Sequence, residues 1–145
     1  MKIVHVVGKS NSGKTTFIRR LIPELRKKGK VATIKHLGHH EFSLDKGKDT
    51  TLFFHEGADI SIGIDNQITV AAIHENSLDN SLSIANTQNM DFVIIEGFKQ
   101  RSFPKIVIGD LVAENCVLSN PTVEEVILSL DLFEDFTPLK PNNTS

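Results

Sequence analysis

The stretch from Gly8 to Thr15, which reads GKSNSGKT, constrains this chain more than any other feature of its sequence. It matches the phosphate-binding pattern G-x-x-x-x-G-K-[ST] at every fixed position. A short apolar and β-branched run precedes it at residues 3–7, and residues 15–28 follow with apolar side chains at helical spacing. Strand, glycine loop and helix form the context that this motif requires, so the sequence predicts a nucleotide-binding α/β protein.

The residue types within the loop suit a triphosphate. The two glycines allow backbone angles that turn successive N–H groups toward an anion, and the following helix adds the positive end of its dipole. We expect Lys14 to reach the β- and γ-phosphates as a catalytic group, and the Thr15 hydroxyl to ligate Mg²⁺. The residues that we expect to contact the nucleotide are Gly8, Lys9, Ser10, Asn11, Ser12, Gly13, Lys14, Thr15 and Thr16.

Lys9 directly follows the first glycine of the loop. In this position it resembles the extra lysine in the deviant phosphate loop of dimerising NTPases, which reaches the nucleotide of the facing subunit. A solvent-exposed lysine is the alternative, and spacing alone does not choose between the two.

Composition sets limits on partners and location. The 145 residues suffice for one domain, which we place at 1–136, with a disordered tail at 137–145. A formal net charge of −2 gives no reason to expect nucleic acid or a membrane as the main partner, and no apolar run approaches the roughly 20 residues that span a bilayer. The single cysteine, Cys116, excludes an internal disulfide and favours the reducing cytoplasm, while its apolar neighbour Val117 predicts a buried thiol.

Apolar runs and turn signals predict the remaining elements. Strands are expected at 31–35, 92–95, 105–108 and 116–118, and helices at 50–56, 75–90 and 121–132. Alternating residues at 59–64 and 67–72 predict an antiparallel hairpin that turns at Asp65-Asn66. The predicted fold is a three-layer α/β/α P-loop domain with a mainly parallel sheet and one antiparallel hairpin, in which strand 31–35 lies beside the phosphate strand.

Acidic residues complete the predicted site. The strand beside the phosphate strand of an NTPase delivers a carboxylate toward Mg²⁺ or its water shell, and Glu96 holds that place at the end of strand 92–95. Asp45 and Asp49 lie in a polar stretch at 36–51 that we interpret as a switch-like segment around the nucleotide. The alternatives are a polar strand end and solvated loop positions. We assign Mg²⁺ to Thr15, Asp45, Asp49 and Glu96, and catalysis to Lys14, Glu96 and Asp49.

Three histidines fall at the start of the same polar stretch. His36, His39 and His40 have the i, i+3, i+4 spacing of zinc or nickel ligands, although Gly38 disfavours the helix that this geometry needs. Contact with phosphate or substrate, and simple solvation, are the other interpretations. An Asn-Lys-x-Asp pattern for guanine is missing, and Ser119-Asn120-Pro121 lies where a base-contacting loop often lies. The residues alone do not choose between ATP and GTP.

Several motifs recur in one order along the chain. They are Gly8–Thr16, Val31–His36, Asp45–Thr50, Gly57–Asp59, Ile95–Lys99 and Pro104–Ile106. Together they closely resemble the molybdopterin-guanine dinucleotide biosynthesis protein B family, up to about Ile108. The lysine-histidine strand end, Gly47-Lys48-Asp49-Thr50 and Glu96-Gly97-Phe98-Lys99 are more particular to that family than the phosphate loop is.

The resemblance implies a P-loop fold, GTP and Mg²⁺ as ligands, weak GTPase activity and a homodimer. The family acts with the guanylyltransferase that joins GMP to molybdopterin, so the implied partners are that molybdenum cofactor enzyme and molybdopterin-binding proteins, with this chain as adapter or GTP supplier. Carried across, Lys14 and Thr15 hold phosphate and Mg²⁺, and the three carboxylates at 45, 49 and 96 are the family's acidic positions.

Two rival functions stay open. A kinase for a small metabolite would use the histidine-rich stretch for its substrate and would consume nucleotide only with an acceptor. A nickel-insertion chaperone would use nucleotide as a dimer switch and bind metal through the three histidines, but a Cys-x-His pair is missing. No arginine is obviously placed as a finger in cis, so slow hydrolysis is expected.

Overall fold

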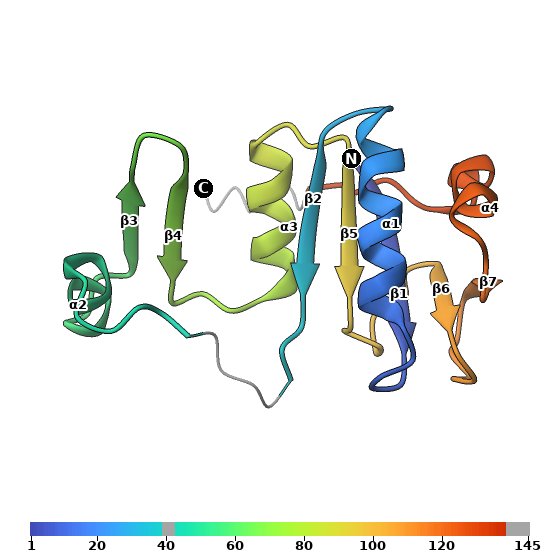
Figure 1. The fold of residues 1–145 in the computed structure, drawn as a ribbon, viewed down its shortest axis with the longest axis horizontal. Coiled ribbons are helices and arrows are strands. Elements are labelled where there is room, and N and C mark those ends of the chain that lie inside the picture. Colours follow the sequence, from blue (N-terminus) through green and yellow to red (C-terminus); the bar gives the residue numbers. More distant parts are fainter. Residues whose placement is uncertain (39–42, 139–145) are drawn as a thin grey trace, which may run out of the picture. The chain divides into compact units, whose positions relative to one another are not determined.

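The computed structural model describes residues 1–38 and 43–138, and the chain divides into two units (Figure 1). The first unit joins Met1–His36 to the chain from Ser81 onward, and the second is Leu37–Asn80. The phosphate loop, Gly8–Thr15, belongs to the first unit. The predicted tail at 137–145 falls, from residue 139 on, outside the described residues, as do His39 and His40.

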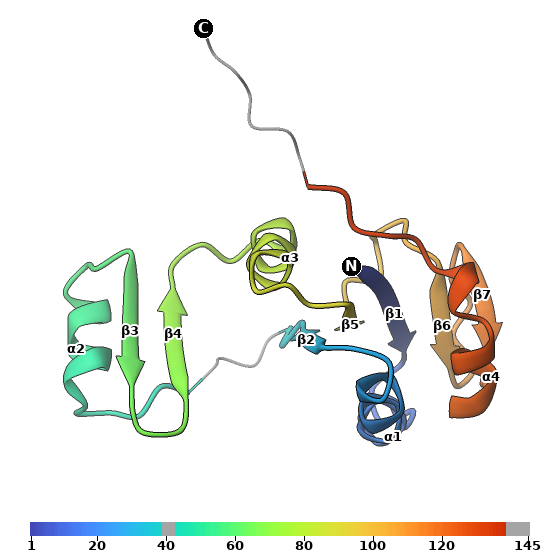
Figure 2. The same cartoon turned by 90° about the horizontal axis from the view of Figure 1, so that it is seen from above.

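A five-stranded parallel sheet forms the centre of the first unit, in the order β2-β5-β1-β6-β7. Its strands are β1 (Lys2–Gly8), β2 (Val31–Lys35), β5 (Phe92–Glu96), β6 (Lys105–Ile108) and β7 (Cys116–Ser119). Its helices are α1 (Lys14–Arg26), α4 (Val123–Leu128) and, from Ser81 on, α3 (Leu78–Thr87). Figure 2 shows α1 and α3 on opposite sides of the sheet. This arrangement confirms the predicted α/β fold.

The order of the strands corrects one prediction. Strand β2 does not lie beside β1, because β5 is inserted between them and pairs with both. A strand in the middle of a parallel sheet is covered on both faces and is therefore continuously apolar. Phe92–Glu96 is buried at its three central residues, whereas Thr33 and Lys35 in β2 are exposed. The polar residues of β2 are thus the signal of an edge strand.

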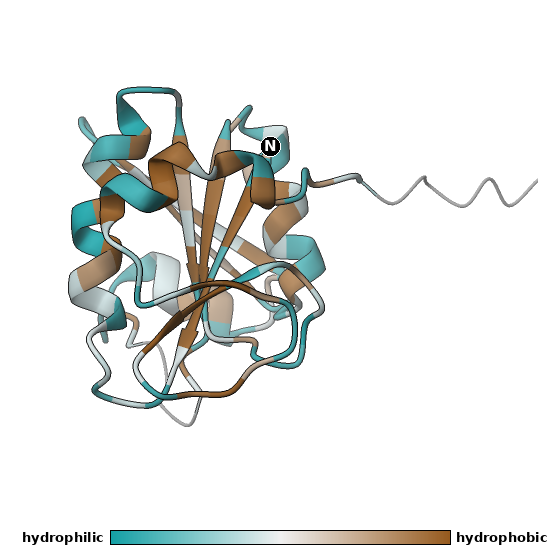
Figure 3. Ribbon diagram, turned by 90° about the vertical axis from the view of Figure 1, so that its right-hand side faces the viewer, coloured by the Kyte–Doolittle hydropathy of each residue, from teal (hydrophilic) through white to brown (hydrophobic). Residues whose placement is uncertain are grey.

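The core lies between the sheet and α1 with α4. Val4 and Val6 of β1 contribute fully buried side chains, and Leu21 and Leu25 of α1 pack into the same cluster. Each such side chain contributes about 1.5–3 kcal/mol relative to an exposed one. Figure 3 shows the central strands as the most hydrophobic part of the ribbon. The alternate residues of β1, including His5, face the opposite side of the sheet.

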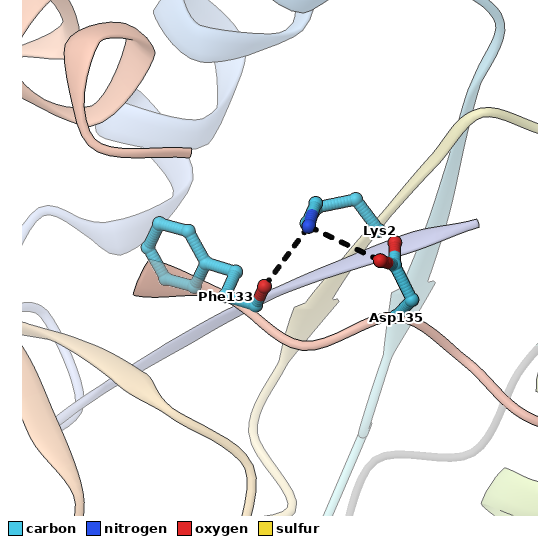
Figure 4. Close-up of polar contacts among 3 residues, drawn as sticks. All are labelled: Lys2, Phe133 and Asp135. Atoms are coloured by element: carbon cyan, nitrogen blue, oxygen red, sulfur yellow. Dashed lines mark hydrogen bonds and ion pairs between the residues drawn. The ribbon is translucent and has the colours of Figure 1, made fainter. Parts of the chain in front are cut away.

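The segment after the last helix closes the open side of β1. Strand β6 pairs with β1 only from His5 onward, so the first residues of β1 lack a neighbour on that side. The backbone of Ile3 donates to Glu134 O at 3.0 Å. Lys2 Nζ lies 3.1 Å from Phe133 O and 3.3 Å from the Asp135 carboxylate (Figure 4). These bonds satisfy backbone groups that would otherwise be left open at the start of the strand.

Two details near the C-terminus differ from the predictions. Helix α4 ends at Leu128, and a 3₁₀ turn at Leu130–Leu132 replaces the last part of the predicted helix 121–132. Thr122 and Glu125 form a capping box that starts α4. Cys116 is exposed and not buried, because it begins β7, an edge strand of the sheet.

The second unit contains α2 (Asp49–His55) and an antiparallel hairpin of β3 (Ile60–Ile64) and β4 (Thr69–Ile73). The hairpin was predicted, but its turn lies one residue later, at Asn66-Gln67, because Asp65 N–H donates to Ile68 O at 3.0 Å. The Asp65 carboxylate accepts from two backbone N–H groups of the turn, at 2.7 and 2.8 Å, which lowers the pKa of that carboxyl. Within the described ranges, no helix is long and apolar enough to cross a bilayer.

Candidate functional site

The phosphate loop begins where β1 ends. Gly8 is in register with Ile108 of β6, and the two backbones approach so closely that a side chain on Gly8 would collide with the Ile108 carbonyl oxygen. The same side chain would lie 2.6 Å from Ser12 Oγ. Only glycine fits between the neighbouring strand and the returning loop, so the first glycine of the motif has a packing reason.

The loop leads into the N-terminus of α1, which no side chain caps, so its backbone N–H groups are available to an anion. Gly13 is the N-cap of α1 with a φ of 93°, and no side chain caps the helix. The first turn carries no acidic residue. Ser12 Oγ is one of two buried side-chain atoms without a hydrogen-bond partner in the described part of the chain. Free N–H groups, a helix dipole and an unpaired hydroxyl suit a bound phosphate.

Lys14 turns back over this loop. Its Nζ donates to Lys9 O at 2.5 Å. Partial burial lowers the pKa of Lys14, the Glu96 carboxylate opposes that shift, and the ammonium groups of Lys99 and Lys35 add to it. Lys14 therefore lies in the field of one carboxylate and two further lysines, and the cations outnumber the single acid. A multiply charged anion would be stabilised at this edge of the sheet.

Glu96 ends β5 next to the phosphate strand, as predicted. It is in register with Val6 of β1 on one side and with Lys35 of β2 on the other. Its side chain is 14% exposed, and its Oε2 lies 3.4 Å from Lys35 Nζ. The carboxylate is thus held at the same edge as the loop. Its placement is confirmed, whereas its role toward Mg²⁺ stays a prediction.

A strained turn follows Glu96. Gly97 has a φ of 96° and Phe98 a φ of 49°, both in the left-handed region. The His36 ring lies against the Phe98 ring with centroids 4.6 Å apart, and a side chain on Gly97 would come within 2.7 Å of His36 Cβ. The structure therefore gives His36 a packing role in this turn. Within the described ranges, no group of three His, Cys, Asp or Glu side chains is placed to hold a metal ion.

His5 of β1 contacts the backbone of this turn, a role that was not predicted from the sequence. Its Nε2 lies 2.6 Å from Gly97 O, and the ring is fully buried. Burial lowers the pKa of His5, against the hydrogen bond to Gly97, with smaller contributions from Lys105 and Arg101. Because a carbonyl oxygen can only accept, Nε2 carries the proton of this bond and donates it to Gly97 O, while Nδ1 has no hydrogen-bond partner among the described residues. A lone polar residue within an otherwise apolar strand is the signal that marks it.

The segment between β5 and β6 begins at this turn and ends at Lys105, the first residue of β6. It is 1% exposed, and its Nζ donates to three backbone carbonyls, of Arg101 at 2.5 Å, Phe103 at 3.2 Å and Glu114 at 3.2 Å. Burial lowers the pKa of Lys105, and the Glu114 carboxylate opposes this. A buried ammonium is tolerated only when its donors are satisfied, and all three are.

The other predicted site residues fall into two groups. Ser10, Asn11, Thr15 and Thr16 lie exposed on the loop and the first turn of α1, and Lys9 is paired with Asp110 at 2.9 Å. Asp45 and Asp49 belong to the second unit, where Asp45 pairs with Lys48 at 3.0 Å and Asp49 begins α2. Their assignment to Mg²⁺ and catalysis remains a prediction.

Asn120 lies in the loop Ser119-Asn120-Pro121, for which contact with a base stays a prediction. Its side-chain amide is bonded on both sides to Gly109, which follows β6. The loop after β7 is therefore fastened to the loop after β6.

Comparison with known proteins agrees with this geometry. Residues 3–128 match the family described as molybdopterin guanine dinucleotide synthesis protein B. The chain belongs to this family. The molybdopterin-guanine dinucleotide biosynthesis adapter protein of Haemophilus influenzae is 34% identical to it, over 88% of this chain and 72% of that protein's length. The protein of the same name from Escherichia coli is 35% identical, over 68% of this chain and 60% of that protein's length.

The chain spans only part of the length of other relatives that it matches. The chain spans 47% of a relative from Methanocaldococcus jannaschii at 38% identity, and 64% of one from Bacillus subtilis at 36% identity. The crystal structure of Bacillus subtilis MobB has a TM-score of 0.70 and 25% identity, covering 92% of this chain and 99% of that one. A crystal structure of molybdopterin-guanine biosynthesis protein B has a TM-score of 0.60 and 25% identity, covering 88% of this chain and 99% of that one.

Proposed function

We propose that this member of the MobB family binds GTP with Mg²⁺ at Gly8–Thr16, hydrolyses it slowly, and acts as an adapter or GTP supplier to a molybdenum cofactor guanylyltransferase. The open start of α1 carries this proposal, because it combines the left-handed Gly13, the unpaired Ser12 hydroxyl and the Lys14 ammonium. The choice of guanine and of the partner rests on the family and on relatives described as adapter proteins.

The residues present also fit a magnesium ion beside the phosphates. The Thr15 hydroxyl is exposed at the start of α1, and the Glu96 carboxylate stands on the adjacent strand. Hard oxygen donors of these two kinds are those that Mg²⁺ prefers. When bound, the ion would neutralise phosphate charge. We assign to Glu96 the orientation of the attacking water, with its carboxylate held by Lys35. The assignment of Asp45 and Asp49 to Mg²⁺ stays a prediction from the sequence.

Replacing Lys14 with Ala tests the phosphate assignment. Among the described residues the Nζ group makes one hydrogen bond, to Lys9 O, so its loss leaves the core intact. A charge-assisted bond to phosphate is worth about 1.5–3 kcal/mol, so affinity for Mg–GTP should fall by at least about tenfold. Isothermal titration gives the affinity, and Lys28→Ala, an exposed lysine beyond the end of α1, is the matched control. Equal affinities for the Lys14 variant and wild type would contradict a phosphate role for the loop.

Replacing Glu96 with Gln separates hydrolysis from binding. The amide keeps the shape of the side chain but loses the charge that orients a water, so GTP turnover should fall at least about tenfold. Mg–GTP affinity should change much less. Phosphate release and titration are measured on the same samples, with the exposed Glu124→Gln in α4 as control. If turnover and affinity fall by the same factor, Glu96 supports the loop and does not act on water.

We also propose that the chain forms a homodimer through its hairpin. Ser61 and Gly63 face α2, since Ser61 Oγ donates to Thr50 O at 2.7 Å and Gly63 lies against the Thr50 side chain. The alternate residues of β3 therefore point away from α2. These residues, Ile60, Ile62 and Ile64, are 52%, 57% and 78% exposed, and we call them the isoleucine face. A two-stranded sheet with an uncovered apolar face is marginal alone, and a second copy would cover it symmetrically.

A charge on the isoleucine face tests the dimer. Ile62→Lys should shift the chain from dimer to monomer in sedimentation equilibrium, because an ammonium at the centre of the face would be desolvated without a partner. Val112→Lys is the matched control, since Val112 is 95% exposed and lies in the first unit. A wild-type chain that sediments as a monomer, or an Ile62 variant that stays dimeric, would contradict this interface.

For its location we propose the cytoplasm. The one cysteine of the chain, Cys116, is exposed as a free thiol, which suits a reducing compartment.

A further inference from the structure

Asn120 makes an unusually complete set of contacts for an exposed residue. Its backbone N–H donates to Val107 O at 2.8 Å. Its side-chain Oδ1 accepts from Gly109 N–H at 2.7 Å, and its Nδ2 donates to Gly109 O at 3.0 Å. Only one orientation of the amide satisfies both side-chain bonds. Asn120 itself adopts a φ of 47°, a conformation that Asn tolerates better than other non-glycine residues.

These bonds fix the path of the chain directly after β6. Gly109 has a φ of 89°, so its backbone turns sharply at the end of the strand. A side chain on Gly109 would lie 3.1 Å from Ser12 Cβ, inside the phosphate loop. The residue before it, Ile108, carries the carbonyl oxygen that limits Gly8. The segment that Asn120 holds, Ile108-Gly109, therefore packs directly against the phosphate loop.

The same segment presents a charge to the loop. Asp110 follows Gly109, and its carboxylate accepts from Lys9 Nζ at 2.9 Å. Both groups are well exposed, so the pair by itself contributes little. Its position nevertheless depends on the backbone of Gly109, which Asn120 fixes.

We propose that Asn120 is a positioning residue for the phosphate loop: by clamping Gly109 it holds Ser12 and the backbone of Gly8–Gly13 in the shape that receives phosphate. This inference rests on the proposed nucleotide binding. It concerns a part of the chain beyond the motifs, and it assigns to a residue after β7 an effect on a loop after β1.

The chain offers a close control at the other end of the same strand. Asn115 precedes β7, has a φ of 55°, and donates from its side-chain amide to Ser102 O at 2.5 Å. Because the sheet is parallel, Asn115 lies at the edge opposite the phosphate loop. Asn120→Gly and Asn115→Gly each remove an amide without adding backbone strain, since glycine accepts a positive φ.

The experiment is titration of the full chain and these variants with Mg–GTP, together with urea unfolding. Asn120→Gly should weaken Mg–GTP binding about tenfold, as expected when two hydrogen bonds that shape the site are lost, and Asn115→Gly should leave it within about twofold of wild type. Asn120→Asp keeps the acceptor for Gly109 N–H but sets a carboxylate oxygen against Gly109 O, which repels it, so this variant should also bind Mg–GTP more weakly than wild type.

The outcomes separate this inference from the proposed function. If the wild-type chain binds Mg–GTP and Asn120→Gly binds it as tightly as Asn115→Gly, the positioning role is wrong and the phosphate site stands. An Asn120→Asp variant that binds as tightly as wild type also contradicts the clamp, because the lost donor to Gly109 O would then contribute nothing. If the wild-type chain binds no Mg–GTP, the proposed function fails and this inference fails with it.

Discussion

The pairing of β1 with β5 on one side and β6 on the other determines where every group of the site lies. Since all three strands run parallel, the phosphate loop, Glu96 and Gly109 emerge at one edge of the sheet. The closeness of the β1 and β6 backbones at Gly8 leaves no room for a side chain and directs the loop over the end of β6. The acidic end of β5 then stands on the other side of the same loop. The pairing of the strands thus places these groups at one edge independently of side-chain contacts within the site.

Two buried polar side chains, in β1 and β6, hydrogen-bond the segments that connect the strands. His5 and Lys105 lie on neighbouring strands in register, and both are almost fully buried. An unpaired buried polar group costs about 1–3 kcal/mol. Backbone carbonyls accept the protons of both residues, whereas Nδ1 of His5 has no hydrogen-bond partner among the described residues. His5 bonds the carbonyl of Gly97, and Lys105 bonds three carbonyls in the segments on either side of β6. His5 therefore fastens the turn after β5, which is next to the site, and Lys105 fastens the segments that lead into β6 and β7 at the opposite edge.

Much of this could be predicted from the sequence, because it depends on local pattern. Continuous apolar runs located β1, β5 and β6, and the motif located the loop and the start of α1. The position of Glu96 followed from its place after an apolar strand. The order of the strands was partly wrong, since periodicity does not state which strands are neighbours. The polar residues of β2 would have indicated an edge. His5 was missed, and Asn120 was singled out only as part of a possible base-contacting loop, because their partners, Gly97 and Gly109, are defined only by the folded chain. The roles of Asp45 and Asp49 stay predictions.

The most direct test of the central claim is nuclear magnetic resonance titration of the ¹⁵N-labelled chain with Mg–GTP. The account predicts saturable shifts of the backbone amides from Gly8 to Thr16, which the phosphates would contact, with smaller shifts at Glu96–Lys99 and Gly109. Saturating shifts confined to other parts of the chain, or no shifts at the loop up to millimolar nucleotide, would contradict it.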